Sequence, residues 1–575
     1  MAKIERDILK QAFLDPIRFA LLVDDKFPDY ASLTSDQTRL DLDTERATKL
    51  FDFVRRQGWL CDVDNRGKVS DDYEQHKHLN QSDLLVLDFN LDPLNSNDPT
   101  IALKLLQRLA DSDNFNLVIV YTAANPGEVV RDVAFALGAG SEEADPARLD
   151  AVDAAIEDLG EDIDKIEQEL SQTAVDEYLT AAGPKKSADG VRDMLRGRQV
   201  PLPIVQQIVL RLAYRRMSER VRSEIVKKRP SALVIQSSIG KDGIQWVAAG
   251  NVFVAVVSKG EEPHVLLDRL LEALDAWSPR PLQVMLTHAR AAIEKTGRLS
   301  DQKVLATPRL QAGWFLRILQ GKDQKEKKAG IGELYGRLFE DLVKKIGPGI
   351  VDFGLKIVEV VLDKDPVDGA KELAGEPATM PSVHVYHALN EFVSSEPCLD
   401  GPMSPGVLFR VESSDIDNYW LCTSPACDLV PGQNRGGWEG QLDPLRFIAA
   451  ARLKPIRNPS AVANALAEAT KGRHLYVMEG EKPIGLEVMD RDSRQMDLEI
   501  AFLHNDALIE NGRFSGYLIT VVDGVPVVNV TKFMSIARLR PEYANRFLMQ
   551  YGQQKSRIGV DFFPPKKEEE RGAAT

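Results

Sequence analysis

The chain has 575 residues and a mass of 63.9 kDa, a length that suggests three to four domains at about 150 residues each. Hydrophobic residues make up 43% and charged residues 28%, which is typical of a globular protein and excludes wholesale disorder, collagen-like repeats and a disulfide scaffold. With 72 Lys and Arg against 87 Asp and Glu, the formal net charge is −15, and so acidic a chain is a poor generic binder of nucleic acid.

No stretch approaches roughly 18 uninterrupted apolar residues, and the start MAKIERDILKQ lacks the apolar region of a signal peptide. The chain has few cysteines for its length, which fits a reducing compartment; they are Cys61, Cys398, Cys422 and Cys427. We therefore expect a cytoplasmic protein with neither a membrane nor a nucleic acid among its partners.

The first 140 residues alternate between strand-like and helix-like segments. In chain order, the patterns predict a strand ending at Val23, a helix over 44–57, a strand at Trp59–Val63, a polar helix-compatible stretch at 70–80, a strand at Leu84–Leu87, a helix at 99–111 and a strand at Leu117–Tyr121. Continuous apolar runs such as 84–87 suit parallel strands that are covered on both faces. This alternation predicts an α/β fold with a doubly wound parallel sheet.

Polar side chains follow directly after the predicted strands. Asp24 and Asp25 come after the first strand, Asp88 after the third and Thr122 after the fourth. In a doubly wound sheet the carboxyl ends of the strands meet at one crevice, where ligands bind. Three carboxylates there would repel one another without a hard divalent cation such as Mg2+, which takes oxygen ligands and is commonly shared with phosphate. An aspartate can attack a phosphoryl group, and Thr122 can supply a hydroxyl to a phosphoryl oxygen.

Such a site also needs a fixed cation, and no suitable lysine follows Thr122 within the next few dozen residues. Much further along the chain, Asn251–Val257 has the pattern of a buried strand, with Ser258 and Lys259 at its end. An amphipathic helix pattern follows over 263–277. We interpret these segments as the fifth strand and helix of the sheet, separated from the fourth strand by a long insertion.

These residues resemble the receiver domain of two-component response regulators, over about 15–278 without the insertion. VDD at 23–25, LDFN at 87–90, YT at 121–122 and SK at 258–259 match its acid pair, phosphoacceptor, hydroxyl residue and lysine. The resemblance implies a flavodoxin-like sheet in which Asp88 accepts a phosphoryl group from a histidine kinase. It also implies that Mg2+ is held by Asp24, Asp25, Asp88 and the backbone carbonyl of Asn90, while Thr122 and Lys259 contact the phosphoryl oxygens.

Two positions depart from the family's pattern. Gly260 follows the lysine where the family usually has proline and a cis peptide, and Val256 is aliphatic where many receivers carry a switching aromatic residue. Chemistry at Asp88 could survive both changes, although the route by which the signal leaves the domain would be unusual. Two other interpretations compete: any one of the aspartates alone could be a turn or helix cap, and the whole domain could be a degenerate receiver used only as a dimerisation scaffold.

Charge segregates in the insertion, residues 141–245, which we expect to be helical. Apolar residues at alternating spacings of three and four give it the heptad pattern of a coiled coil: Leu149, Val152, Ile156, Leu159, Ile163, Ile166 and Leu170. Residues 141–170 contain twelve acidic and two basic residues, whereas residues 207–230 contain eight basic and two acidic ones, mostly in a second predicted helix over 204–228. The opposite charges favour a helical hairpin within one chain, or the same pairing across a homo-oligomer. A nucleic-acid-binding helix is a weaker interpretation, because no aromatic residues interleave for base stacking.

We divide the rest of the chain into four segments: the last part of the receiver at 246–280, a mainly helical region at 281–362, a linker at 363–382 that is rich in Pro, Gly and charge, and a β-rich α+β domain at 383–575. Strands are expected in this last domain at Val407–Val411, Tyr419–Cys422, His474–Met478, Leu498–Leu503, Tyr517–Val522 and Val525–Val530, and a helix at 541–551.

The C-terminal half offers little recognisable chemistry, since it has no GxxxxGKS or GxxxxGKT, HExxH or GxSxG motif. A zinc site could be drawn from His384, His387, Cys398, Cys422 and Cys427, but paired CxxC spacing is missing and buried structural cysteines are favoured. The Pro425–Asp428 turn is the best candidate for a functional loop. A pocket that collects Cys427, Asp428 and His504 would indicate an effector enzyme switched on by phosphorylation. No helix-turn-helix with a basic recognition helix stands out.

In architecture the chain resembles the receiver-bearing regulators of Detocs-type bacterial anti-phage two-component systems. There a kinase acts with an effector, whose receiver is fused to a nucleotide-degrading phosphorylase domain, and with a receiver-bearing buffer protein. The C-terminal half shows no purine-nucleoside-phosphorylase pattern, so the resemblance implies the buffer role. Asp88 would then drain phosphoryl groups from the kinase and restrain accidental activation of the effector. We expect no stand-alone enzyme activity beyond phosphoacceptance and autodephosphorylation.

Overall fold

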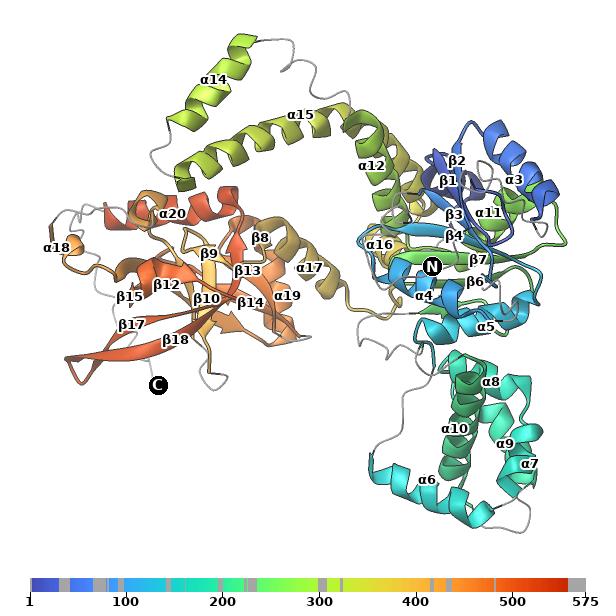
Figure 1. Cartoon of the computed structure of the whole chain (residues 1–575). Coiled ribbons are helices and arrows are strands. Elements are labelled where there is room, and N and C mark those ends of the chain that lie inside the picture. Colours follow the sequence, from blue (N-terminus) through green and yellow to red (C-terminus); the bar gives the residue numbers. More distant parts are fainter. Residues whose placement is uncertain are drawn as a thin grey trace. The chain divides into compact units, whose positions relative to one another are not determined.

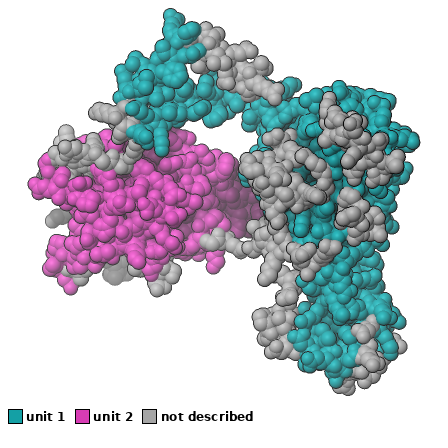
Figure 2. Space-filling view, viewed as in Figure 1, with its two compact units in different colours: residues 1–375 teal, residues 376–575 magenta. Residues whose placement is uncertain are grey.

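The computed structural model describes residues 3–29, 42–65, 79, 82–91, 98–140, 146–160, 162–194, 200–221, 225, 235–297, 308–320, 324–413, 418–430, 437–479 and 482–556. These residues form two compact units, residues 1–375 and residues 376–575, which are coloured separately in Figure 2. The stretch 70–80, which we expected to be helix-compatible, lies outside the described residues except for Leu79.

A seven-stranded sheet with the order β2-β1-β3-β4-β7-β6-β5 forms the centre of the first unit (Figure 1). The first five strands in this order are mutually parallel, and β6 and β5 add to the edge as antiparallel strands. The strands are β1 (Phe19–Val23), β2 (Leu60–Asp64), β3 (Leu84–Leu87), β4 (Asn116–Thr122), β5 (Gln236–Ser237), β6 (Gln245–Ala249) and β7 (Val252–Ser258). The parallel part has the flavodoxin-like strand order, which confirms the predicted doubly wound sheet.

Helices cover both faces of this sheet. On one face, α4 (Thr100–Asp111) and α5 (Pro126–Ala136) bury their apolar sides against β1, β3, β4 and β7. On the other face lie the N-terminal helices α1 (Arg6–Leu9) and η1 (Lys10–Leu14), then α3 (Thr44–Arg56) and α11 (Leu266–Trp277), the last preceded by the 3-10 turn η4 (Pro263–Val265). All four residues of β3 are buried, as expected of a strand between two helical layers.

The insertion forms a helical bundle that shares a hydrophobic core with the first face of the sheet. Its helices are α6 (Pro146–Leu159), α7 (Asp162–Gln168), α8 (Gln172–Leu179), α9 (Lys185–Met194) and α10 (Leu202–Arg220). The basic helix α10 packs against α6, α8 and α9. Arg211 forms an ion pair with Asp153 of α6, and Arg215 lies 3.3 Å from Glu167 of α7, so the acidic and basic helices pair within one chain.

Two features of the insertion do not follow from its heptad and charge patterns. The heptad segment is not one continuous helix, because Gly160 adopts a φ of 50° between α6 and α7, a left-handed conformation that ends a helix. Val152, Leu159, Ile166 and Leu170 are nevertheless buried. The insertion is also not helical to its end, since β5 and β6 pair antiparallel beside β7 and widen the sheet.

The first unit continues in helices α12 (Pro281–Gly297), α14 (Pro308–Leu319) and α15 (Gln324–Val358), then in the 3-10 turn η5 (Glu359–Val361) and α16 (Pro366–Ala374). Helix α16 lies within the stretch 363–382 that we expected to be a linker; Asp365 caps it, and its Lys371 is buried. The boundary between the two units, at Gly375, falls inside the same stretch. In the described part of the chain, no helix combines the length and the apolar character needed to cross a bilayer.

The second unit is built on a closed antiparallel barrel. Strands follow the order β11-β10-β18-β17-β15-β12, and β11 also pairs with β12, which closes the ring. The barrel strands are β10 (Val407–Val411), β11 (Tyr419–Cys422), β12 (Arg446–Ile456), β15 (Asp497–Leu503), β17 (Arg513–Val522) and β18 (Val525–Leu539). Phe409, Trp420 and Phe533 are among the largest buried side chains of its core.

Shorter elements surround the barrel. A hairpin of β13 (His474–Glu479) and β14 (Lys482–Glu487) extends from β12. The longer helices of this unit are α17 (Ser382–Ser394), α19 (Pro459–Ala467) and α20 (Pro541–Lys555). The remaining short elements are β8 (Ser395–Glu396), β9 (Gly401–Pro402), η6 (Ala426–Leu429), α18 (Gly437–Gly440), η7 (Ala469–Lys471), η8 (Asn505–Ala507) and β16 (Leu508–Ile509). The β-rich prediction is confirmed, but β12 and β14 have no counterpart among the predicted strands.

Candidate phosphoacceptor site

The candidate site residues of the first unit are positioned by backbone hydrogen bonds that continue the parallel ladder past the strand ends. The N–H of Asp88 donates to the carbonyl of Val23 at 2.8 Å, and the N–H of Lys259 donates to the carbonyl of Thr122 at 2.6 Å. The N–H of Asp24 donates to the carbonyl of Asp64 at 3.3 Å. The apolar strands thus fix the backbone from which each polar side chain projects.

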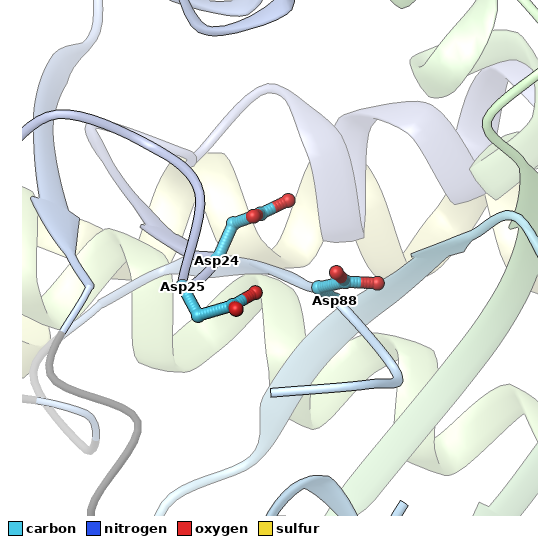
Figure 3. A group of neighbouring side chains, drawn as sticks. All are labelled: Asp24, Asp25 and Asp88. Carbon is cyan, nitrogen blue, oxygen red and sulfur yellow. The ribbon is translucent and has the colours of Figure 1, made fainter. Parts of the chain in front are cut away.

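Three carboxylates meet at this edge of the sheet, as Figure 3 shows for Asp24, Asp25 and Asp88. One oxygen from each lies within 4.8 Å of the others, and the three residues are only 3%, 5% and 8% exposed. Asp24 Oδ1 accepts a hydrogen bond from the N–H of Lys26 at 2.9 Å, whereas Asp25 Oδ1 is buried without a hydrogen-bond partner. A buried carboxylate oxygen without a donor is costly, and its position among two other carboxylates suits a cation.

Lys259 reaches into this cluster from the end of β7. Its Nζ lies 2.8 Å from Asp24 Oδ2 and 2.9 Å from Asp88 Oδ2, and the side chain is 11% exposed. The ammonium therefore bridges two of the three carboxylates. The structure brings together Asp24, Asp25, Asp88 and Lys259 although a helical bundle of the insertion separates Lys259 from the others in the sequence.

The electrostatics follow from burial and from this ion pair. Burial, followed by the neighbouring charge of Asp24, raises the pKa of Asp25. Burial also raises the pKa of Asp88, and the ammonium of Lys259 only partly offsets the effect. For Lys259, burial acts to lower the pKa, but the charges of Asp24 and Asp88 prevail and raise it, so the side chain stays cationic.

Thr122 and Asn90 lie beside the cluster. Thr122 is fully buried at the end of β4, opposite Ser258 in the register with β7, and its Oγ1 accepts a hydrogen bond from the N–H of Ala124 at 3.0 Å. Asn90 is half-buried, and its backbone N–H acts to lower the pKa of Asp88. The backbone of Thr122 is thus paired with the strand end that carries Lys259, and Asn90 follows Asp88 by two residues.

Phe27 is a site residue that the sequence reasoning missed. Its ring is buried, and Nζ of Lys259 lies 6.0 Å from the ring centroid, within the range of a cation–π contact. Phe27 directly follows Asp24, Asp25 and Lys26. This position could have indicated a site residue, because a turn after the strand brings the next side chain back over the strand end. The N–H of Phe27 donates to the carbonyl of Asp24 at 3.2 Å, which closes that turn.

The candidate residues of the C-terminal half do not form a comparable cluster. Cys422 is buried within the barrel, Cys427 is exposed and donates to Asp428 at 3.3 Å, and His504 contacts Ser515 and Tyr517. His387 is buried and its Nε2 pairs with the carbonyl of Ile484. Among the described residues, the three aspartates of the first unit are the one group of His, Cys, Asp or Glu side chains with metal-binding geometry, so the zinc interpretation has no support.

Comparison with known families agrees with the geometry of this site. Residues 16–168 match the response receiver domain family, a range that includes Asp24, Asp25, Asp88 and Thr122 but ends before Lys259. Searches of curated proteins and of solved structures gave no match. Lys259 lies beyond the matched range, but β7 pairs in parallel with β4 and brings it to the same edge of the sheet. The N-terminal part of this chain is a receiver domain of the response-regulator family.

Proposed function

We propose that the protein is a two-component response regulator that accepts a phosphoryl group from a histidine kinase on Asp88. The observation that carries this proposal is the position of the Asp88 carboxylate, which lies beside those of Asp24 and Asp25 and 2.9 Å from the ammonium of Lys259, a cation that it shares with Asp24. In this arrangement a carboxylate nucleophile lies at the carboxyl edge of the parallel strands. Two further carboxylates and one ammonium lie beside it, as phosphoryl transfer requires.

In the reaction, an oxygen of the Asp88 carboxylate attacks the phosphorus of a phosphohistidine. The P–N bond breaks as the new P–O bond forms, and the leaving imidazole keeps the electron pair and takes a proton from solvent. Asp88 must be ionised to attack, and burial opposes ionisation by raising the pKa of this side chain. Lys259 counteracts that effect, because its ammonium favours the charged carboxylate at 2.9 Å.

The donor set fits Mg2+, since three carboxylates supply only oxygen ligands and Asp25 Oδ1 has no other partner. Asp24, Asp25, Asp88 and the backbone carbonyl of Asn90 would hold the ion. When bound, Mg2+ neutralises charge on the phosphoryl oxygens during transfer. Asp24 and Asp25 contribute by holding their oxygens near Asp88 before any phosphodonor arrives.

Thr122 and Lys259 would respond to phosphorylation by contacting the phosphoryl oxygens. The acyl phosphate adds oxygens that compete for the ammonium, which in this structure is shared between Asp24 and Asp88. The backbone N–H of Lys259 donates to the carbonyl of Thr122. A movement of Lys259 would therefore also shift the ends of β4 and β7. Helix α5 follows β4 and carries Asp132 and Glu128, both of which pair with Arg220 of the insertion. The insertion is therefore connected to the strand end through α5.

The proposed division of the first unit is a receiver over 1–140 and 246–280 that is interrupted by the insertion at 141–245. A homo-oligomer formed through the insertion remains a proposal; its argument from opposite charges is weakened because the acidic and basic helices pair within one chain. Native mass spectrometry of the full chain tests it.

We further propose that the protein acts as a phosphate sink or buffer in a bacterial anti-phage system, where an effector response regulator competes for the same kinase. This part rests on the resemblance in architecture, a receiver with a long insertion joined to a C-terminal half without a recognised enzymatic motif. The buffer role requires that Asp88 take phosphoryl groups faster than the effector does.

The experiment uses the autophosphorylated cognate histidine kinase, with labelled phosphate on its histidine. Added wild-type protein should remove the label from the kinase, and the Asp88→Asn variant should not. With the effector also present, wild-type protein should delay its labelling and the variant should leave it unchanged. Transfer to wild type without any delay of the effector would refute the buffer role and leave the receiver function standing.

A further inference from the structure

A cavity in the second unit is lined mainly by cationic side chains. It has a volume of about 270 Å3 and is lined by Lys471, Arg473, Met489, Arg491, Asp492, Arg494, Arg546 and Gln550. These residues come from the turn before β13, the loop between β14 and β15, and helix α20. Five of the eight are Lys or Arg, in a chain whose formal net charge is −15. We call this feature the basic cavity.

Arg546 is held in place by a glycine. Gly472 has a φ of 62°, and a Cβ atom at this position would overlap the guanidinium of Arg546. Arg546 Nη2 also donates a hydrogen bond to the backbone carbonyl of Lys471 at 2.8 Å. A side chain at position 472 would strain the left-handed backbone and would displace the guanidinium of Arg546 from its place.

The loop that carries Arg491 and Arg494 is anchored to the same helix. Gln550 Nε2 donates to the carbonyl of Arg494 at 3.2 Å. The side-chain amide of Gln554 accepts from the N–H of Met496 and donates to its carbonyl, both at 2.8 Å. Helix α20 therefore fixes the backbone on both sides of the cavity, and the cations are presented by a preformed frame.

The carboxylates near the cavity account for only part of this positive charge. Glu468 lies 2.8 Å from Lys471 and 3.8 Å from Arg491, and it also contacts Arg473, whose side chain is 8% exposed. Arg473 lies 3.7 Å from Glu487 as well. Hydrogen bonds and charge from Lys471, and then from Arg473, hold the pKa of Glu468 at about 2. A purely structural ion-pair network explains these three cations.

Arg494 and Arg546 are different. Within the described ranges of the chain, neither side chain forms an ion pair, although both line the same cavity as the other three cations. Cations that line one cavity repel one another, and a bound anion would offset the repulsion. Guanidinium groups are suited to this because their forked N–H donors match the oxygens of a phosphate in pairs.

We propose that the basic cavity binds the phosphate group of a small phosphorylated molecule. Its volume of about 270 Å3 is slightly below the usual range of ligand pockets, about 300–1,000 Å3, which suits a phosphate group with a small substituent better than an extended polymer. Arg546 and Arg494 would contact the phosphate oxygens, whereas Lys471, Arg473 and Arg491 are already paired with carboxylates. The site is independent of the chemistry at Asp88, and its failure would leave the proposed receiver function untouched.

Isothermal titration of the full chain with inorganic phosphate and, separately, with ATP tests the proposal. Both titrations use Asp88→Asn protein in EDTA without divalent metal, so that neither phosphorylation nor a metal–phosphate complex at the receiver contributes. Arg546→Gln removes one guanidinium from the cavity. Gly472→Ala keeps every charge but displaces Arg546. Lys555→Gln removes one charge from the last turn of the same helix and is the matched control.

We expect R546Q and G472A to weaken binding of the probe by at least about tenfold and K555Q to leave it within about twofold. Binding of phosphate alone identifies a free anion or a small phosphorylated ligand, and tighter binding of ATP identifies a nucleotide; either result supports the proposal. Absence of binding by both probes would overturn it, as would equal affinities in R546Q and wild type. Tighter binding of a single-stranded oligonucleotide that displaces phosphate would also overturn it, in favour of a nucleic-acid surface. If G472A fails to fold, the comparison of R546Q with K555Q decides.

Discussion

The ammonium of Lys259 lies 2.8 Å from the carboxylate of Asp24, although the two residues are 235 positions apart in the chain. The pair forms because β7 adds to β4 in parallel register and places Lys259 one residue past its end. The helical bundle that separates them in the sequence projects from the sheet without altering the strand order. The receiver site is therefore a property of the completed sheet, and the segment 16–168 alone lacks its cation.

The first prediction concerns Lys259→Met, which keeps the length of the side chain and removes its charge. Without metal, the variant leaves Asp24 and Asp88 buried without their cation, and loss of one partner from a buried pair costs about 3 kcal/mol or more. Because the ammonium and Mg2+ compete for the same carboxylates, Mg2+ should stabilise the variant more than it stabilises wild type.

Hydrogen exchange at the amides of β3 and β4, with and without Mg2+, measures this difference. Lys241→Met, on an exposed lysine of the same unit, is the control. Equal metal dependence in K259M and wild type would show that Lys259 does not share the metal's carboxylates.

The second prediction concerns pH. Burial raises the pKa of Asp132 to about 6 in the folded protein, from 3.8 when it is exposed, in spite of its ion pair with Arg220. The folded state therefore binds the proton more tightly, and the free energy of unfolding decreases as pH rises from about 4 to about 6. The difference corresponds to roughly 3 kcal/mol.

The Asp132→Asn variant should lose this dependence, so that its stability relative to wild type increases between pH 4 and pH 7. Glu128→Gln, which removes the more exposed partner of Arg220, is the matched control. Urea unfolding monitored at α5 and α10 provides the measurement. If the free energy of unfolding changed with pH in the same way for D132N and wild type, the raised pKa of Asp132 would be contradicted.

The third prediction tests the close approach of β15 and β17 in the barrel. A Cβ at Gly516 in β17 would overlap the backbone carbonyl of Phe502 and approach the Cα of Leu503 in β15. Gly516→Ala should therefore destabilise the second unit, by about 1–3 kcal/mol or more. Gly552→Ala in α20, where nothing lies within 4 Å, should be neutral or stabilising. Hydrogen exchange at the amides of β15 and β17 is the measurement. Equal protection in the two variants would contradict the close contact of Gly516 with β15.

The fourth prediction separates structural from reactive cysteines. Burial raises the pKa of Cys422 to about 12, and Cys398 is also buried, whereas Cys427 is exposed. A thiol reagent should label native protein rapidly at Cys427, at least about tenfold faster than at Cys422. Cys427→Ser should abolish the rapid phase. Rapid labelling of Cys422 that appears only after chelation of metal would instead revive a zinc site.

Much of the first unit could be predicted from the sequence because its strands are local, continuous apolar runs. β3 and β7 are recognisable as such, and each is followed at once by the polar residue that the site needs, Asp88 or Lys259. The pairing of the acidic and basic segments also follows from their charge. The break at Gly160 was missed because the apolar heptad spacing continues across it, while the left-handed backbone leaves no trace in that spacing.

The second unit was harder to predict because its decisive contacts are distant in sequence. β12 reads RFIAAARLKPI, with three successive alanines, several charges and a proline, and it pairs with three other strands. β14 contains Pro483 and Gly485, which usually interrupt strands. The basic cavity was missed for the same reason, since its arginines come from segments that α20 brings together only in the fold.

The central claim is that Asp88 is a metal-dependent phosphoacceptor. The most direct test is intact mass of wild-type and Asp88→Asn protein after incubation with a small-molecule phosphodonor, with Mg2+ or with EDTA. We predict that wild type gains the mass of one phosphoryl group in Mg2+ only, and that the variant gains none. Equal labelling of wild type and variant, or no labelling of wild type by either the donor or the kinase in Mg2+, would contradict the account.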